Sequence, residues 1–232
     1  MSEGKTKKAV VCPMCSELGR AEIFTSINVT LNPELRKAVL DGSVFEWVCD
    51  NCGHQARLNY PILYNDMNNS FMVYLIPKIE RFQLCDRDLE KKFSNLRNIN
   101  KRIVPDFNAF KEKIFIFESR LDDMAVELTK AAIRQTVSNK LGGVKIAEGY
   151  LSMYDRESNT MGFTYFTGDD LKPYVQTARL EIYAKSKDII EKFAVKDKKL
   201  KGFVKIDGEW AENILYRYKR AKHIEKLNKL KE

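Results

Sequence analysis

The sequence predicts an α+β protein in three parts: an N-terminal β module with two cysteine pairs, a helical middle segment, and a small C-terminal α+β part. Changes in hydrophobic periodicity support this division. Apolar residues tend to alternate with polar ones in the first third, recur every third or fourth position from Asp86 to about Leu141, and alternate again after Gly143. We therefore expect domains at residues 1–85, 86–143 and 144–232.

The first third is expected to contain short strands around one helix. A strand is indicated by apolar or β-branched residues at alternate positions: Ile23, Thr25, Ile27 and Val29. Asn32 is a suitable N-cap for a following helix, and Gly42 is a suitable stop. Further strands are expected at Val44–Val48, Gln55–Tyr60 and Phe71–Ile76, with a polar turn at 65–69.

The remaining elements follow from caps and turn residues. Three helices are expected in the middle segment: Asp88–Arg97, Pro105 to about Glu118, and Asp122 or Asp123 to Gly142. Strands are then expected at Val144–Tyr154, Met161–Phe166, Thr177–Tyr183 and Gly202–Ile206, with a helix capped by Ser186 before the last of them. From Glu209 a terminal helix is expected to dock through a stripe of Trp210, Ile214, Tyr218, Ala221, Ile224 and Leu227.

Composition excludes several classes of protein. Hydrophobic residues make up 44% of the 232 positions, which is typical of globular chains. Apolar runs such as Ile114–Phe117 are far shorter than the roughly 20 residues that a membrane span needs. With no apolar secretory segment before Cys12, we expect a cytoplasmic protein without a membrane partner, its cysteines reduced or bound to metal.

The two Cys-x-x-Cys pairs are the most specific feature of the chain. They are Cys12-Pro13-Met14-Cys15 and Cys49-Asp50-Asn51-Cys52, and Gly53 follows the second pair at a position that favours glycine. Two such turns can complete a tetrahedron of thiolates around one structural zinc ion. The alternatives are a redox dithiol and two unrelated pairs, but Cys12 is not followed by the helix that a redox site needs. The predicted ligands are Cys12, Cys15, Cys49 and Cys52.

The N-terminal third also resembles the CpXC domain, a family named for its Cys-Pro-x-Cys motif. The resemblance covers residues 12 to about 80 and rests on the first cysteine pair together with Pro33–Ser43, Phe45–Cys49, Cys52–His54, Asn59–Asp66 and Phe71–Val73. It implies a fold similar to zinc ribbons and the same four ligands, and it brings no established activity. The stretch from Arg102 to Lys130 is similar to the helical extension of longer members.

Other candidate sites have simpler interpretations. The two histidines, His54 and His223, form no metal motif, and no common nucleotide or serine-hydrolase motif is present. The pairs Asp122-Asp123 and Asp169-Asp170 are expected to cap helices or form turns rather than to catalyse. Aromatic residues of the β module, namely Tyr60, Tyr64, Phe71 and Tyr74, are expected in the core more than on a recognition surface. We predict no catalytic or cofactor-binding residues, while an enzyme site in the C-terminal part stays a third hypothesis.

Net charge suggests two classes of partner. The chain carries 40 basic and 32 acidic residues, a balance of +8, and residues 217–232 alone hold 7 basic and 2 acidic groups. The leading hypothesis is a zinc-binding adaptor or regulatory protein with a protein partner. The alternative is nucleic-acid binding by the ribbon and the terminal helix, with contacts from Arg217, Lys219, Arg220, Lys222 and Lys226. No oligomeric state is predicted.

Overall fold

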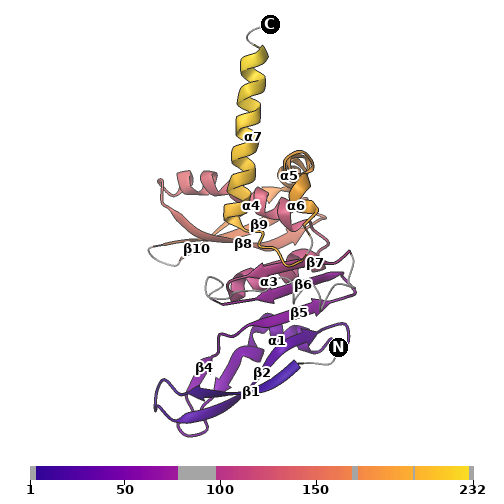
Figure 1. Ribbon diagram of the computed structural model, residues 1–232. Coiled ribbons are helices and arrows are strands. Elements are labelled where there is room, and N and C mark those ends of the chain that lie inside the picture. The colour runs from indigo at the N-terminus through magenta and orange to yellow at the C-terminus, as the bar shows by residue number, and fades with distance from the viewer. Residues whose placement is uncertain (1–3, 78–97, 169–171, 201, 230–232) are drawn as a thin grey trace. The chain divides into compact units, whose positions relative to one another are not determined.

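The structure is a computed structural model that describes residues 4–77, 98–168, 172–200 and 202–229 (Figure 1). The chain forms two compact units, Met1–Lys111 and Glu112–Glu232, which we call unit 1 and unit 2. The protein is of mixed α+β class, as predicted, with the cysteine pairs in unit 1. The expected domain boundaries at residues 85 and 143 stay predictions.

Unit 1 is built on a five-stranded sheet with the strand order β1-β2-β5-β6-β7. The β2–β5 and β6–β7 pairs are parallel and the β1–β2 and β5–β6 pairs are antiparallel. The strands span β1 (Gly4–Val11), β2 (Leu18–Asn28), β5 (Ile62–Asp66), β6 (Phe71–Leu75) and β7 (Asn100–Val104). Strands β5 and β6 are buried almost throughout, which explains the continuous apolar sequence of β6, whereas β5 also buries Asn65 and Asp66 at its end.

The crossover from β2 to β5 carries the second cysteine pair. It contains α1 (Leu35–Asp41), the 3-10 turn η1 (Ser43–Phe45), and a hairpin of β3 (Glu46–Val48) and β4 (Gln55–Arg57). Gly42 ends α1 in the left-handed conformation with φ of 89°, as its glycine predicts. The η1 turn replaces the first two residues of the expected strand Val44–Val48 and buries Phe45 against Tyr60, with ring centroids 5.2 Å apart.

Unit 2 combines a three-stranded antiparallel sheet, of order β10-β9-β8, with helices. Its elements are α4 (Asp123–Lys140), β8 (Ile146–Asp155), β9 (Thr160–Thr167), β10 (Pro173–Arg179), α5 (Leu180–Phe193), α6 (Val195–Lys198) and α7 (Gly208–Lys229), and the division between the units falls within α3 (Phe107–Glu118). One core cluster lies between α4 and the sheet, including Val137 and Phe163. A second joins α4, α5 and α7 through residues such as Leu128, Ile190 and Ile214.

A network of charged side chains lies inside unit 2. Lys113 Nζ lies 3.2 Å from Asp123 Oδ2 and 3.1 Å from Glu127 Oε1, and these side chains are at most 3% exposed. Lys130 Nζ lies 2.9 Å from Glu112 Oε1 and 3.0 Å from Glu127 Oε2. Because each ammonium faces two carboxylates, the network ties α3 to α4 at positions where a lone charge would be strongly destabilising.

Several expected elements differ in the structure. The strands β1, β5 and β7 were not predicted, and the expected turn at 65–69 begins inside β5, which ends at Asp66. The expected strand Thr177–Tyr183 has the wrong limits, because β10 ends at Arg179 and α5 begins directly after it. No strand of the expected length occurs in the described part of Gly202–Ile206. The predicted helix at Asp88–Arg97 lies outside the described residues.

Ser186 does not cap a helix. It lies inside α5, where its side chain is buried and its hydroxyl donates to the Ile182 carbonyl oxygen at 3.1 Å. The same hydroxyl accepts a hydrogen bond from Thr129 of α4 at 2.9 Å. In the sequence alone, a serine that joins two helices through such hydrogen bonds looks the same as a serine that caps a helix. This accounts for the incorrect prediction.

Candidate metal centre

Each cysteine pair occupies a turn between two antiparallel strands. Cys12 and Cys15 lie in the β1–β2 turn, and Cys49 and Cys52 lie in the β3–β4 turn. In Figure 1 these two turns lie together at one end of unit 1. In both, the amide of the first cysteine donates to the carbonyl oxygen five residues later at 2.9 Å, so the backbones of the two turns follow one pattern.

The residue after each second cysteine completes this repeated pattern. Ser16 and Gly53 have positive φ angles, 60° and 71°, and their amides donate to the carbonyl oxygens of Cys12 and Cys49 at 2.9 Å. The positive φ lets the chain turn sharply enough for both thiols of a pair to face the same point. Gly53 has the role that its type predicts, whereas Ser16 adopts a conformation that is unfavourable for a residue with a side chain.

The four sulfur atoms fit one tetrahedral ion. All four Sγ atoms lie within 4.8 Å of one another, and the Cys12–Cys52 and Cys15–Cys49 separations are both 3.7 Å. Zn–S bonds of about 2.3 Å in a regular tetrahedron require S···S edges of about 3.8 Å. A disulfide would need an S–S distance of about 2.05 Å, so the thiols are placed as ligands rather than as bonded pairs.

Hydrogen bonding favours the thiolate at one ligand. The backbone of Glu17 and the side chain of Asn51 lower the pKa of the Cys15 thiol to about 6. Asn51 Nδ2 donates to Cys15 Sγ across the two turns at 3.6 Å. At Cys52 the backbone of His54 lowers the pKa, but burial and the other three thiols raise it to about 12. Four thiols this close therefore cannot all ionise unless a cation neutralises them.

The site is closed in its coordination chemistry. Four thiolates complete a tetrahedral zinc sphere and leave no position for a water molecule or substrate. His54 belongs to the second turn through its backbone and is not in the ligand cluster, which consists of the four cysteines. The arrangement can therefore hold a metal ion that links two hairpins, and it offers no open position for metal catalysis.

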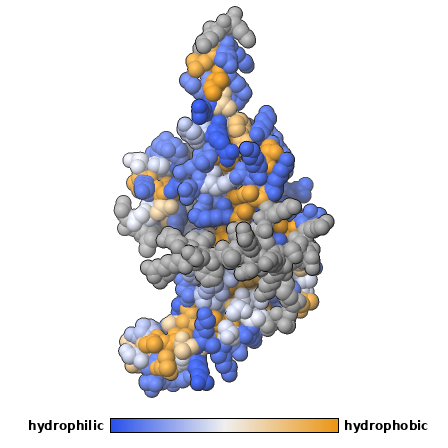
Figure 2. All heavy atoms as spheres, viewed as in Figure 1, coloured by the Kyte–Doolittle hydropathy of each residue, from blue (hydrophilic) through white to orange (hydrophobic). Residues whose placement is uncertain are grey.

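Apolar side chains surround this centre on the protein surface. Val11 (63% exposed) and Leu18 (65%) are paired across the β1–β2 hairpin, Met14 (69%) lies between the two cysteines of the first turn, and Val48 (50%) precedes the second turn. Figure 2 shows hydrophobic surface at this end of unit 1. We call these four residues the knuckle patch. Each lies within three positions of a cysteine ligand, so the geometry of the centre determines where they are presented.

A family model described as CpXC protein matches residues 10–130, which is 121 of the 232 residues. The chain belongs to the CpXC family. The match contains all four clustered cysteines and extends through α3 into α4, so it confirms the resemblance and the extension noted in the sequence. Searches of curated proteins and of solved structures find no match.

Most other candidate residues of this CpXC protein are structural. Tyr60, Tyr64 and Phe71 are at most 6% exposed, so they form core rather than a stacking surface for bases. Asp122 caps α4, as predicted, by accepting hydrogen bonds from two backbone amides, and the neighbouring Asp123 belongs to the buried charge network. The fifth cysteine of the chain, Cys85, and the pair Asp169-Asp170 lie outside the described residues.

The terminal helix differs from its prediction in one important respect. The side chain of Ile214 is buried in unit 2, but Ile224 and Leu227 are 48% and 45% exposed. The expected apolar stripe therefore docks as far as Tyr218, whose ring contacts that of Phe193 with centroids 5.8 Å apart. The five predicted nucleic-acid contacts, Arg217, Lys219, Arg220, Lys222 and Lys226, are all exposed.

Sequence reasoning missed two features of functional interest. The knuckle patch was not predicted, although apolar residues beside or between paired cysteines are a usable signal because the turns hold such side chains at the surface. The charge network of unit 2 was also missed. Its five residues are common helix-surface types, and no local pattern distinguishes them from solvent-exposed charges.

Proposed function

We propose that this CpXC protein is a cytoplasmic adaptor or regulatory protein that binds another protein through the knuckle patch, with one structural zinc ion holding that surface in place. The observation that supports the proposal is the exposure of four apolar side chains around a closed tetrathiolate centre. A metal ion with four thiolate ligands cannot bind a substrate, so catalysis at the metal does not explain the exposed apolar side chains. Clustered apolar side chains on a rigid turn are typical of contact sites between proteins.

Zinc is proposed over iron because of its lack of redox chemistry. The ligand set and the S···S distances suit either ion in a tetrahedral sulfur site. Zinc has no redox chemistry, and the centre lies beside a contact surface whose shape must stay constant. Under this proposal the metal acts by linking residues that are 34 to 40 positions apart in the chain.

The proposal is tested by replacing the patch without touching the ligands. The double variant Met14→Ser/Leu18→Ser should keep its metal and fold but lose a specific partner, identified by photo-crosslinking from position 48 of the same patch in intact cells. The matched control is Val175→Ser/Leu200→Ser, which alters two residues of unit 2 that are similarly exposed, at 61% and 56%. The proposal fails if the patch variant retains every crosslinked or co-purified partner of the wild type, or if the control loses the same partner.

A further inference from the structure

The distal part of α7, Arg217–Lys229, contains the largest local excess of positive charge in the described chain. It holds six Lys or Arg residues and one Glu, which gives +5 out of a total of +8. Figure 1 shows this part of the helix extending beyond the other elements of unit 2. We call it the distal segment.

Few contacts engage this charge. Every side chain from Lys222 to Lys229 is exposed. Among the described residues, ion pairs reach two of the six cations: Lys222 pairs with Glu225 of the same segment at 3.1 Å, and Arg217 lies 3.8 Å from Asp197. Exposed pairs of this kind hold their partners weakly, so the segment remains available to an external anion.

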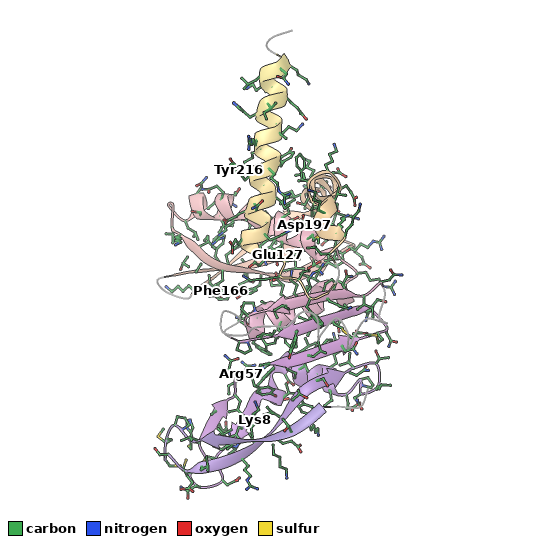
Figure 3. The ribbon with its side chains drawn as sticks, in the orientation of Figure 1. Lys8, Arg57, Glu127, Phe166, Asp197 and Tyr216 are labelled. Atoms are coloured by element: carbon green, nitrogen blue, oxygen red, sulfur yellow. The ribbon has the colours of Figure 1, made fainter. Side chains whose placement is uncertain are left out.

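Helical geometry separates the exposed side chains into two faces. Four lysines recur at steps of three, four and three residues and therefore share one side of the helix: Lys219, Lys222, Lys226 and Lys229. At a rise of about 1.5 Å per residue this lysine stripe is about 15 Å long. Three exposed apolar residues, Tyr216, Ile224 and Leu227, lie about 130° away around the axis. Tyr216 is labelled in Figure 3 and is 65% exposed.

We propose that the lysine stripe binds the phosphate backbone of nucleic acid. A 15 Å length of DNA duplex carries about nine phosphates, which provides an extended anion of matching length. Contacts from lysine to phosphate need no burial of the helix and carry no sequence information, so binding should be independent of base sequence. A protein groove is disfavoured as the occupant because, within the described part of the helix, the apolar face offers three large residues, and Arg220 lies among them on the same side. This site is independent of the knuckle patch.

The test is fluorescence anisotropy of the full-length, metal-loaded protein with a short fluorescein-labelled DNA duplex of arbitrary sequence, over a series of salt concentrations. Four engaged lysines predict a slope of about −3.6 in log affinity against log salt. The quadruple variant with Gln at 219, 222, 226 and 229 should lose most of that slope and at least about tenfold in affinity at low salt. A second duplex of different sequence should bind equally well.

Two further variants separate this proposal from the alternatives. The matched control replaces Lys185, Lys187, Lys192 and Lys196 of α5 and α6 with Gln, and it should keep the wild-type slope because it removes the same charge elsewhere in unit 2. The variant Ile224→Ser/Leu227→Ser should bind like the wild type. Absence of binding at low salt, equal losses in the two lysine variants, or a loss confined to the serine variant would each overturn the proposal. The last result would assign DNA binding to the apolar face of the segment instead of the lysine stripe.

Discussion

Ser16 and Gly53 show how much a single backbone position contributes to the metal centre. Both follow the second cysteine of a pair, both have φ near +60° to +70°, and both donate an amide to the first cysteine's carbonyl oxygen. A side chain at such an angle costs roughly 1–2 kcal/mol, so the two turns solve the same problem with unequal strain.

The pair permits a reciprocal prediction. Gly53→Ala should lower the free energy of unfolding of the metal-loaded protein by about 1 kcal/mol, because a Cβ at this position meets nothing within 4 Å and the cost is backbone strain alone. Ser16→Gly should raise it by about 0.5–1 kcal/mol for the same reason. Urea unfolding measures both changes. If Ser16→Gly destabilises as much as Gly53→Ala, the strain at Ser16 is not the controlling factor.

At this scale the sequence was a good guide to which cysteines cluster and a poor guide to backbone strain. The four cysteines and Gly53 were predicted because their types are specific to their roles. The role of Ser16 was not predicted, since serine is common at many turn positions. Its left-handed conformation depends on the turn around it.

Among the elements, α4 is the one whose limits follow most directly from sequence. Asp122 Oδ1 accepts from the amides of Met124 and Ala125 at 2.9 and 3.2 Å, and the helix ends at Lys140, before Gly142 and Gly143. The strands were harder to predict. In β7, the last strand of the sheet, the charged residues Lys101 and Arg102 are buried, so their polarity concealed a buried strand.

Removal of the α4 cap should have a measurable effect. Asp122→Ala should lower the free energy of unfolding by about 1 kcal/mol, whereas Asp122→Ser should retain most of the wild-type stability because a hydroxyl can accept the same bonds. Chemical denaturation with the two variants side by side provides the comparison. Equal losses for alanine and serine would show that the aspartate acts through its charge or packing instead.

The buried network between α3 and α4 predicts a larger effect. Lys113→Met should cost about 3–5 kcal/mol, because it leaves Asp123 and Glu127 buried beside one another without their shared cation. Lys145→Met is the matched control, since Lys145 is exposed and its loss should stay within about 0.5 kcal/mol. Thermal and urea unfolding both report the difference. Similar stability of the two variants would show that the network contributes nothing specific.

The same network predicts a dependence on alkaline pH. Burial lowers the pKa of Lys113, but the carboxylates of Glu127, Asp123 and Glu112 outweigh it and raise the pKa above its ordinary value of 10.5. The stabilising contribution is therefore complete below about pH 10.5 and is lost as the pH rises through the folded-state pKa. The stability difference between the wild type and Lys113→Met should shrink above pH 10.5. A difference that stays constant or widens there would contradict the assignment.

For the molecule as a whole, the two candidate binding surfaces belong to different units. Unit 1 contains the thiol cluster and the knuckle patch, and unit 2 contains the lysine stripe of α7. No helix among the described residues is both long and apolar enough to cross a membrane. Composition was sufficient to locate the positive charge. Helical periodicity, however, predicted that Ile224 and Leu227 would be buried, and both are exposed. Periodicity cannot show where a helix extends past its last packing partner.

The central claim is that the four cysteines bind one structural zinc ion, and the metal content of the protein purified without added metal tests it most directly. Elemental analysis of the wild type should give one zinc and no iron per chain. Cys49→Ser should lose the zinc and, because metal binding is coupled to folding, much of its stability, while Cys85→Ser should keep both. A folded wild type without metal, or with iron in place of zinc, would contradict the claim.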